Sequence, residues 1–135
     1  MDQWELICRK VSGLEEDLYQ LDDWYRDERR AIEEKIDTYA ERQLQFNTLM
    51  ESKYETALYD FRQRGVQEYQ ELTNLVEAYL DIGHNQFLHA FRECDDQLDE
   101  LEQTYKKKYN AVEEKLQEAY AERRRIDLEL LDQGK

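Results

Sequence analysis

The sequence predicts an all-α fold, and within that class a single domain over residues 1–135 built as a long, coiled-coil-like antiparallel helical hairpin. The chain has no proline and only four glycines, so few positions would interrupt a helix. Apolar residues recur every seven positions in two separate ladders, one in each half of the chain. A glycine lies midway between the ladders, at Gly65. A reversal there would bring the two ladders together.

The two ladders are in register if the chain folds back at Gly65. The first ladder is Trp4, Val11, Leu18, Tyr25, Ile32, Tyr39 and Phe46, and the second is Phe91, Leu98, Tyr105, Val112, Ala119 and Ile126. The expected pairs are Trp4 with Ile126, Leu18 with Val112, Tyr25 with Tyr105, Ile32 with Leu98 and Tyr39 with Phe91. This pairing covers the apolar seam of each arm with that of the other.

The first arm is expected at about residues 3–63. Its ladder has a companion seam at the spacing of coiled-coil a and d positions, formed by Ile7, Leu14 and Leu21. The next two positions of that companion seam are Glu28 and Lys35, and the apolar stripe widens instead to Ile36 and Met50. The pattern therefore predicts a narrow seam that becomes looser towards the turn.

The turn is expected near Gly65, because arginines precede this glycine and Val66 follows it, as at many helix C-termini. The second arm is then expected at about residues 66–131. A kink or short break is expected in it near Gly83, where Asn85 is a candidate N-cap. A reversal at Gly83 instead would pair Phe91 with Leu75 and leave the apolar seam of roughly the first 35 residues without a partner inside the chain.

The charge of the chain argues against nucleic acid as a partner. Its net charge is −14, whereas binding a polyanion requires a continuous basic face. The basic runs at 106–108 and 123–125 are interpreted first as solvated helix faces and second as partner contacts.

No catalytic, metal or cofactor site is expected, and the protein is not expected to be an enzyme. His84 and His89 are five positions apart, which does not place two imidazoles on one helical face. Cys8 and Cys94 would lie far apart in the hairpin, so both are expected to be free thiols. Cys94 continues an apolar ladder, which favours a buried structural role.

A partner-binding surface is expected in the segment from Leu58 to Phe91. This is the most apolar part of the chain, and one opposing helix cannot cover all of its apolar side chains. The candidate contact residues are Leu58, Phe61, Tyr69, Leu72, Val76, Tyr79 and Phe87.

The N-terminus has no apolar run of the kind found in secretory signal peptides, and no segment approaches transmembrane length. The expected site of synthesis and residence is the cytoplasm. Export without a cleaved signal peptide stays open.

An acidic, proline-free hairpin that begins with a Trp/Leu/Ile ladder and closes with a charged helix resembles the small accessory proteins of LXG toxins in Gram-positive type VIIb secretion, and more broadly the WXG-type hairpins. The Trp-x-Gly turn of the WXG type is not present. An aromatic residue four positions before an acidic one, a hallmark of such substrates, occurs at Tyr19/Asp23, Trp24/Glu28, Phe91/Asp95 and Tyr109/Glu113. Tyr109 and Glu113 lie nearest the C-terminal helix end and are the candidate export motif.

The resemblance implies a targeting factor or chaperone. Such a protein would bind the N-terminal helical domain of a cognate toxin, alone or with a second small helical protein, and help deliver it to the secretion machine. The residues leave an alternative from another class, a structural coiled coil in which two hairpins associate as a homodimeric four-helix bundle.

Overall fold

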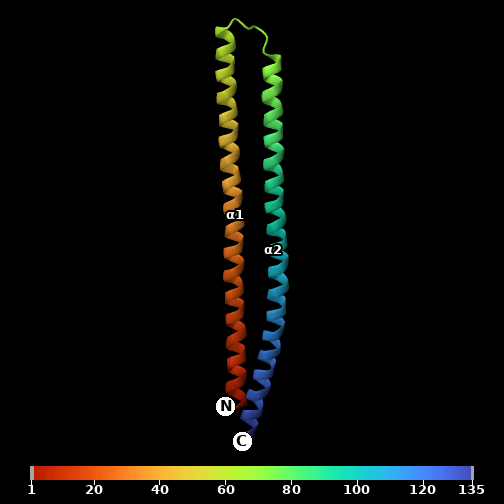
Figure 1. The fold of residues 1–135 in the computed structure, drawn as a ribbon. Helices are drawn as coiled ribbons and strands as arrows, with labels where there is room; N and C mark the ends of the chain where they lie inside the picture. The colour runs from red at the N-terminus through yellow and green to blue at the C-terminus, as the bar shows by residue number, and fades with distance from the viewer. Residues whose placement is uncertain (1, 135) are drawn as a thin grey trace. The chain divides into compact units, whose positions relative to one another are not determined.

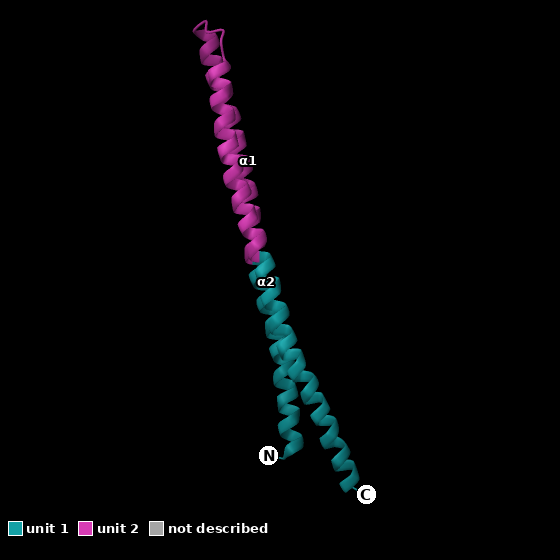
Figure 2. Ribbon diagram, turned by 90° about the vertical axis from the view of Figure 1, so that its right-hand side faces the viewer, with its two compact units in different colours: residues 1–30, 98–135 teal, residues 31–97 magenta. Residues whose placement is uncertain are grey.

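The computed structural model describes residues 2–134, and its two α-helices are joined by a short turn (Figure 1). Helix α1 is Gln3–Gln63 and helix α2 is Gln70–Gln133. No strand occurs in this part of the chain, and the predicted all-α helical hairpin is confirmed. Packing divides the chain into two compact units (Figure 2), a terminal unit of residues 1–30 and 98–135 and a turn unit of residues 31–97.

Helix α1 begins with a capped first turn. The backbone N–H of Glu5 donates a hydrogen bond of 2.8 Å to the Oδ1 atom of Asp2, and the N–H of Leu6 donates one of 3.1 Å to the Asp2 carbonyl. Asp2 is therefore the N-cap, and its negative charge also interacts favourably with the positive end of the helix dipole.

Helix α1 ends in a Schellman motif centred on Gly65, which has a positive φ of 76°. The N–H of Val66 donates to the Phe61 carbonyl at 2.9 Å, and the N–H of Gly65 donates to the Arg62 carbonyl at 3.2 Å. The predicted turn at this glycine is confirmed. Residues 66–69 belong to the turn, so α2 starts later than the sequence pattern indicated.

The terminal unit contains most of the fully buried apolar residues. Its core cluster is Ile7 and Val11 from α1 with Leu116, Ala119 and Ile126 from α2, and Trp4, Leu14, Leu18 and Tyr120 pack against it. Residues from the start of α1 thus meet residues from the end of α2, as the expected antiparallel register requires. Further along, the rings of Tyr25 and Tyr105 stack with centroids 4.3 Å apart.

The turn unit is held by aromatic contacts between its two helical segments. Tyr39 meets Phe91 edge to face, with ring centroids 6.4 Å apart. Nearer the turn, the Tyr54 hydroxyl lies 3.2 Å from the Thr73 hydroxyl, within hydrogen-bonding distance. The successive partners converge on Gly65, so this unit too is an antiparallel helix pair.

The expected break near Gly83 is wrong, because α2 continues through this residue without interruption. Gly83 is buried against the ring of Phe46, and a Cβ atom at Gly83 would lie only 2.6 Å from Phe46 Cζ. The glycine therefore serves close packing between the helices and does not end one of them.

Replacing Gly83 by alanine should destabilise the protein by about 1 kcal/mol. The added methyl group would displace the Phe46 ring, and overpacking of this kind costs about 1–3 kcal/mol, more than the roughly 1 kcal/mol that alanine gains over glycine in a helix. Chemical denaturation followed by circular dichroism measures the change.

Gly13→Ala is the matched control, because a Cβ atom at Gly13 meets no atom within 4 Å. This variant should be more stable than the parent by up to about 1 kcal/mol. Equal stabilisation by both substitutions would contradict the packing role of Gly83.

Candidate partner-binding surfaces

Three of the four aromatic residues expected to bind a partner are engaged within the hairpin. Phe61 and Tyr69 stack with ring centroids 6.2 Å apart and planes at 15°. Phe87 lies against Phe46 at 6.1 Å between centroids. All four rings are half-buried. Their first role is to hold the two sides of the hairpin together within the turn unit, and each ring keeps part of its surface exposed.

The other residues of the same expected set are divided in exposure. Leu58, Leu72 and Val76 are half-buried between the helices. Tyr79 is 53% exposed and is the one expected contact residue whose side chain lies mostly in solvent. The structure therefore does not bring the expected residues together as one exposed patch.

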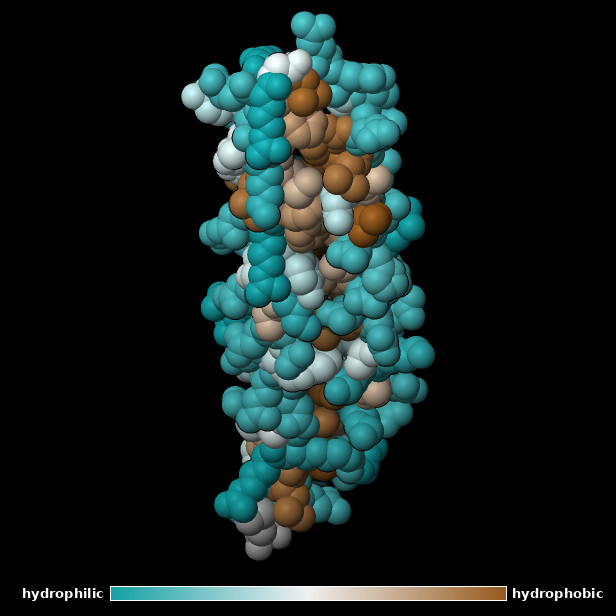
Figure 3. Space-filling model, turned by 45° about the horizontal axis from the view of Figure 1, so that its top comes forward, coloured by the Kyte–Doolittle hydropathy of each residue, from teal (hydrophilic) through white to brown (hydrophobic). Residues whose placement is uncertain are grey.

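An apolar stripe on α2 leaves three neighbouring large apolar side chains of the turn unit in solvent. It consists of Leu75, Tyr79 and Ile82, which are 54%, 53% and 55% exposed and occupy positions i, i+4 and i+7 of one helical face. Figure 3 shows apolar side chains gathered in a band on the part of the molecule that carries the turn. Sequence reasoning omitted Leu75 and Ile82 from the site, although their spacing from Tyr79 was a signal that could have identified them.

The stripe continues into a cavity beside the turn. The cavity has a volume of about 510 Å³, and its walls are Phe61, Val66, Leu72 and Leu75 with the carboxylates of Glu68 and Glu71. Apolar surface on the stripe and in this cavity is therefore continuous through Leu75.

An acidic groove lies on the other flank of the turn unit. It has a volume of about 630 Å³, an apolar floor of Tyr54, Val76 and Leu80, and the carboxylates of Glu51, Glu77 and Asp81 among its walls. Glu77 and Tyr79 are two positions apart, hence about 200° apart around the helix axis. The groove and the stripe therefore lie on opposite flanks of α2.

The candidate export residues lie in the terminal unit on one face of α2. Tyr109 and Glu113 are both half-buried, and the ring of Tyr109 is 5.8 Å from that of Tyr105 between centroids. The Tyr105 hydroxyl donates a 2.5 Å hydrogen bond to the Asp22 carboxylate. This hydrogen bond is the main cause, and burial the second, that raises the pKa of Tyr105 to about 12. Tyr109 thus belongs to a packed tyrosine cluster across the two helices.

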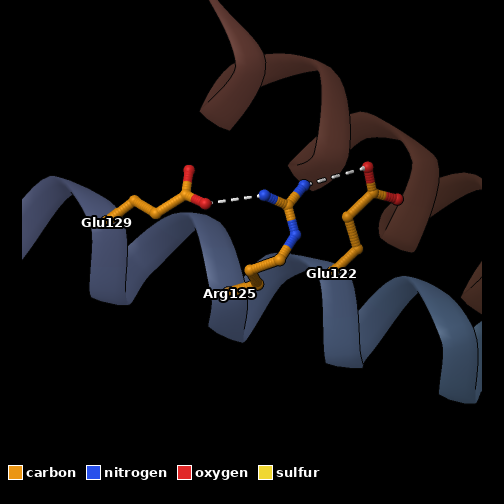
Figure 4. A network of polar contacts seen from close by, with 3 residues as sticks. All are labelled: Glu122, Arg125 and Glu129. Carbon is orange, nitrogen blue, oxygen red and sulfur yellow. Dashed lines mark hydrogen bonds and ion pairs between the residues drawn. The ribbon is translucent and has the colours of Figure 1, made fainter.

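Several side chains of the basic runs are engaged within the hairpin. Arg125 bonds Glu129 at 2.7 Å and lies 4.0 Å from Glu122, all on α2 (Figure 4). The ammonium group of Lys108 lies 4.3 Å from the centroid of the Trp24 ring. These contacts fit solvated helix faces, and exposed pairs of this kind contribute little to stability.

The described part of the chain holds no group of three or more His, Cys, Asp or Glu side chains arranged to bind a metal ion. Both cysteines are free thiols, as expected, and Cys94 is buried with 2% exposure. Between residues 2 and 134, neither helix has a stretch apolar enough to span a membrane.

Comparison of the chain with protein-family models, with curated proteins and with solved structures found no match. The surfaces of the turn unit are therefore interpreted from their own geometry and chemistry.

Replacing Asp22 by asparagine should lower the pKa of Tyr105 from about 12 towards its ordinary value of 10. In the parent, the raised pKa means that folding favours the neutral phenol of Tyr105. The hydrogen bond to Asp22 therefore stabilises the folded protein below pH 10, and this stabilisation is lost as the pH rises from 10 to about 12. Absorbance of tyrosinate against pH measures the shift.

Asp23→Asn is the control, because Asp23 pairs with Arg26 at 3.2 Å and not with Tyr105. This variant should keep the late-titrating tyrosine. Identical titration curves for the Asp22→Asn variant and the parent would show that the hydrogen bond does not persist in solution.

Proposed function

We propose that this protein is a non-enzymatic binding partner whose turn unit docks against a helical region of another protein. The single observation that supports this most is the apolar stripe of Leu75, Tyr79 and Ile82, in which each side chain is more than half exposed. A row of large apolar side chains left in water is unfavourable for an isolated chain and is typical of interaction surfaces.

A helical partner fits the stripe best. Its residues follow one helical face, so a third helix laid alongside could insert its own side chains between them. The neighbouring cavity would accept a further apolar side chain, and its acidic rim would favour a basic residue next to it.

We further propose, on the resemblance described above, that the partner is the N-terminal helical domain of an LXG toxin of type VIIb secretion. This protein would shield the apolar face of that domain and help target it for export, alone or with a second small helical protein. Tyr109 and Glu113 would act as the export motif in this scheme.

Self-association is the second candidate function. The same stripe could pack against its copy in a second chain and form a homodimeric four-helix bundle without a foreign partner. The net charge of −14 opposes this arrangement more than it opposes a basic or neutral partner.

The triple substitution Leu75→Gln, Tyr79→Gln and Ile82→Gln should weaken the complex about a hundredfold. Each side chain would lose about 1 kcal/mol of apolar burial, since about half of its surface is already covered in the free protein. The measurement is co-purification and titration calorimetry with the N-terminal domain of an LXG toxin encoded beside this gene. Glutamine keeps helix propensity high, so helicity should be retained.

A control variant replaces Tyr19 and Tyr59, which are 68% and 66% exposed and lie outside the stripe. Changing both to glutamine should leave binding within about twofold of the parent. Equal binding by stripe and control variants would refute the stripe as the docking surface. A parent chain with the solution mass of a dimer, made monomeric by the stripe substitutions, would favour self-association.

A further inference from the structure

We propose that the acidic groove of the turn unit is a second docking site, and that its occupant is an amphipathic helix carrying lysine or arginine on both sides of an apolar ridge. The inference rests on the proposed function, because it specifies the chemistry of a partner segment on a flank that the apolar stripe does not reach.

The floor of the groove is apolar and has its buried polar groups satisfied. Val76 and Leu80 are half-buried on α2, and Tyr54 closes the floor from α1. The Tyr54 hydroxyl lies 3.2 Å from the Thr73 hydroxyl, which gives both groups a hydrogen-bonding partner across the helix pair. An apolar side chain could therefore enter the groove without leaving these hydroxyls unpaired.

The walls of the groove carry negative charge on both sides. Glu51 lies on the α1 wall, and Glu77 and Asp81 lie one turn apart on the α2 wall. No ion pair involving these three carboxylates occurs in the described chain. No lysine or arginine of this part of the chain lines the groove, and the one nitrogen base in its lining is the imidazole of His84. A docked segment with cations flanking its apolar ridge would meet an opposite charge on each side.

The walls also favour a helix over an extended segment. Both are helices, whose backbone hydrogen bonds are already made, so the groove has no strand edge to pair with an extended chain. A helix satisfies its own backbone groups and can seat side chains spaced by one turn. The spacing of Glu77 and Asp81 matches cations at positions i and i+4 of such a helix.

The test uses the full-length chain and two synthetic helical peptides. Each peptide has about 20 residues, enough to span the groove, with a leucine and alanine ridge. One carries lysine beside the ridge, and the other carries glutamate at the same positions. Fluorescence anisotropy at low ionic strength should show that the lysine peptide binds at least about tenfold more tightly. The difference should shrink at about 0.5 M salt, where exposed charges are screened.

Two charge-matched variants locate the binding. Glu51→Gln, Glu77→Gln and Asp81→Asn together should weaken lysine-peptide binding about tenfold. The control substitutions Glu34→Gln, Glu41→Gln and Asp96→Asn remove the same number of charges from the same unit, outside both the groove and the cavity beside the turn. They should change lysine-peptide binding by less than about twofold. Equal losses in the two variants would mean general attraction to an acidic protein and would overturn the inference, as would failure of the lysine peptide to bind.

The outcome is separable from that of the proposed function. If a toxin domain binds through the apolar stripe while the groove variant behaves as the parent towards the lysine peptide, the groove inference is wrong and the proposed function stands. If the lysine peptide binds at the groove while no toxin domain binds, the groove inference stands and the toxin partner is wrong.

Discussion

Each helix segment in the described chain packs against only one other helix, and this constraint governs the rest of the structure. A helix with one neighbour can bury one stripe of side chains and must expose the others. In the terminal unit the buried stripe is a narrow seam between the two helices, in which Ile7, Val11 and Ala119 are almost fully buried. The turn unit packs Phe46 against Phe87 across its helix pair, while Leu75, Tyr79 and Ile82 on the neighbouring face of α2 stay more than half exposed.

The acidic composition is compatible with this exposure. Charged side chains cover the outer faces of both helices, and the net charge of −14 keeps like molecules apart while apolar side chains such as Tyr79 and Ile82 stay in water. Where basic residues occur, several are held by their own helix, as Arg125 is by Glu129. Among the described residues, no lysine or arginine lines the acidic groove.

Two glycines serve the hairpin for different physical reasons. Gly65 adopts a positive φ that other residues enter only with strain, and it ends α1 where the chain must reverse. Gly83 has ordinary helical geometry and is required for its small size, because the Phe46 ring occupies the place of a side chain. One glycine changes the direction of the chain, and the other lets two helices approach within the turn unit.

The sequence by itself determined the helices, the turn and much of the pairing, because a seven-residue apolar period and a lone midpoint glycine are local properties of the chain. The pairing of Tyr25 with Tyr105 followed from that register, and the structure shows the two rings stacked. Only the tertiary structure decided which apolar residues of the turn unit are covered, since Phe87 packs against Phe46 while Ile82, on the same helix, remains exposed. It also assembled the acidic groove, whose carboxylates come from both helices. The burial of a side chain and the grouping of charges both depend on which residues of the other helix face it, and the sequence of one segment alone does not specify those residues.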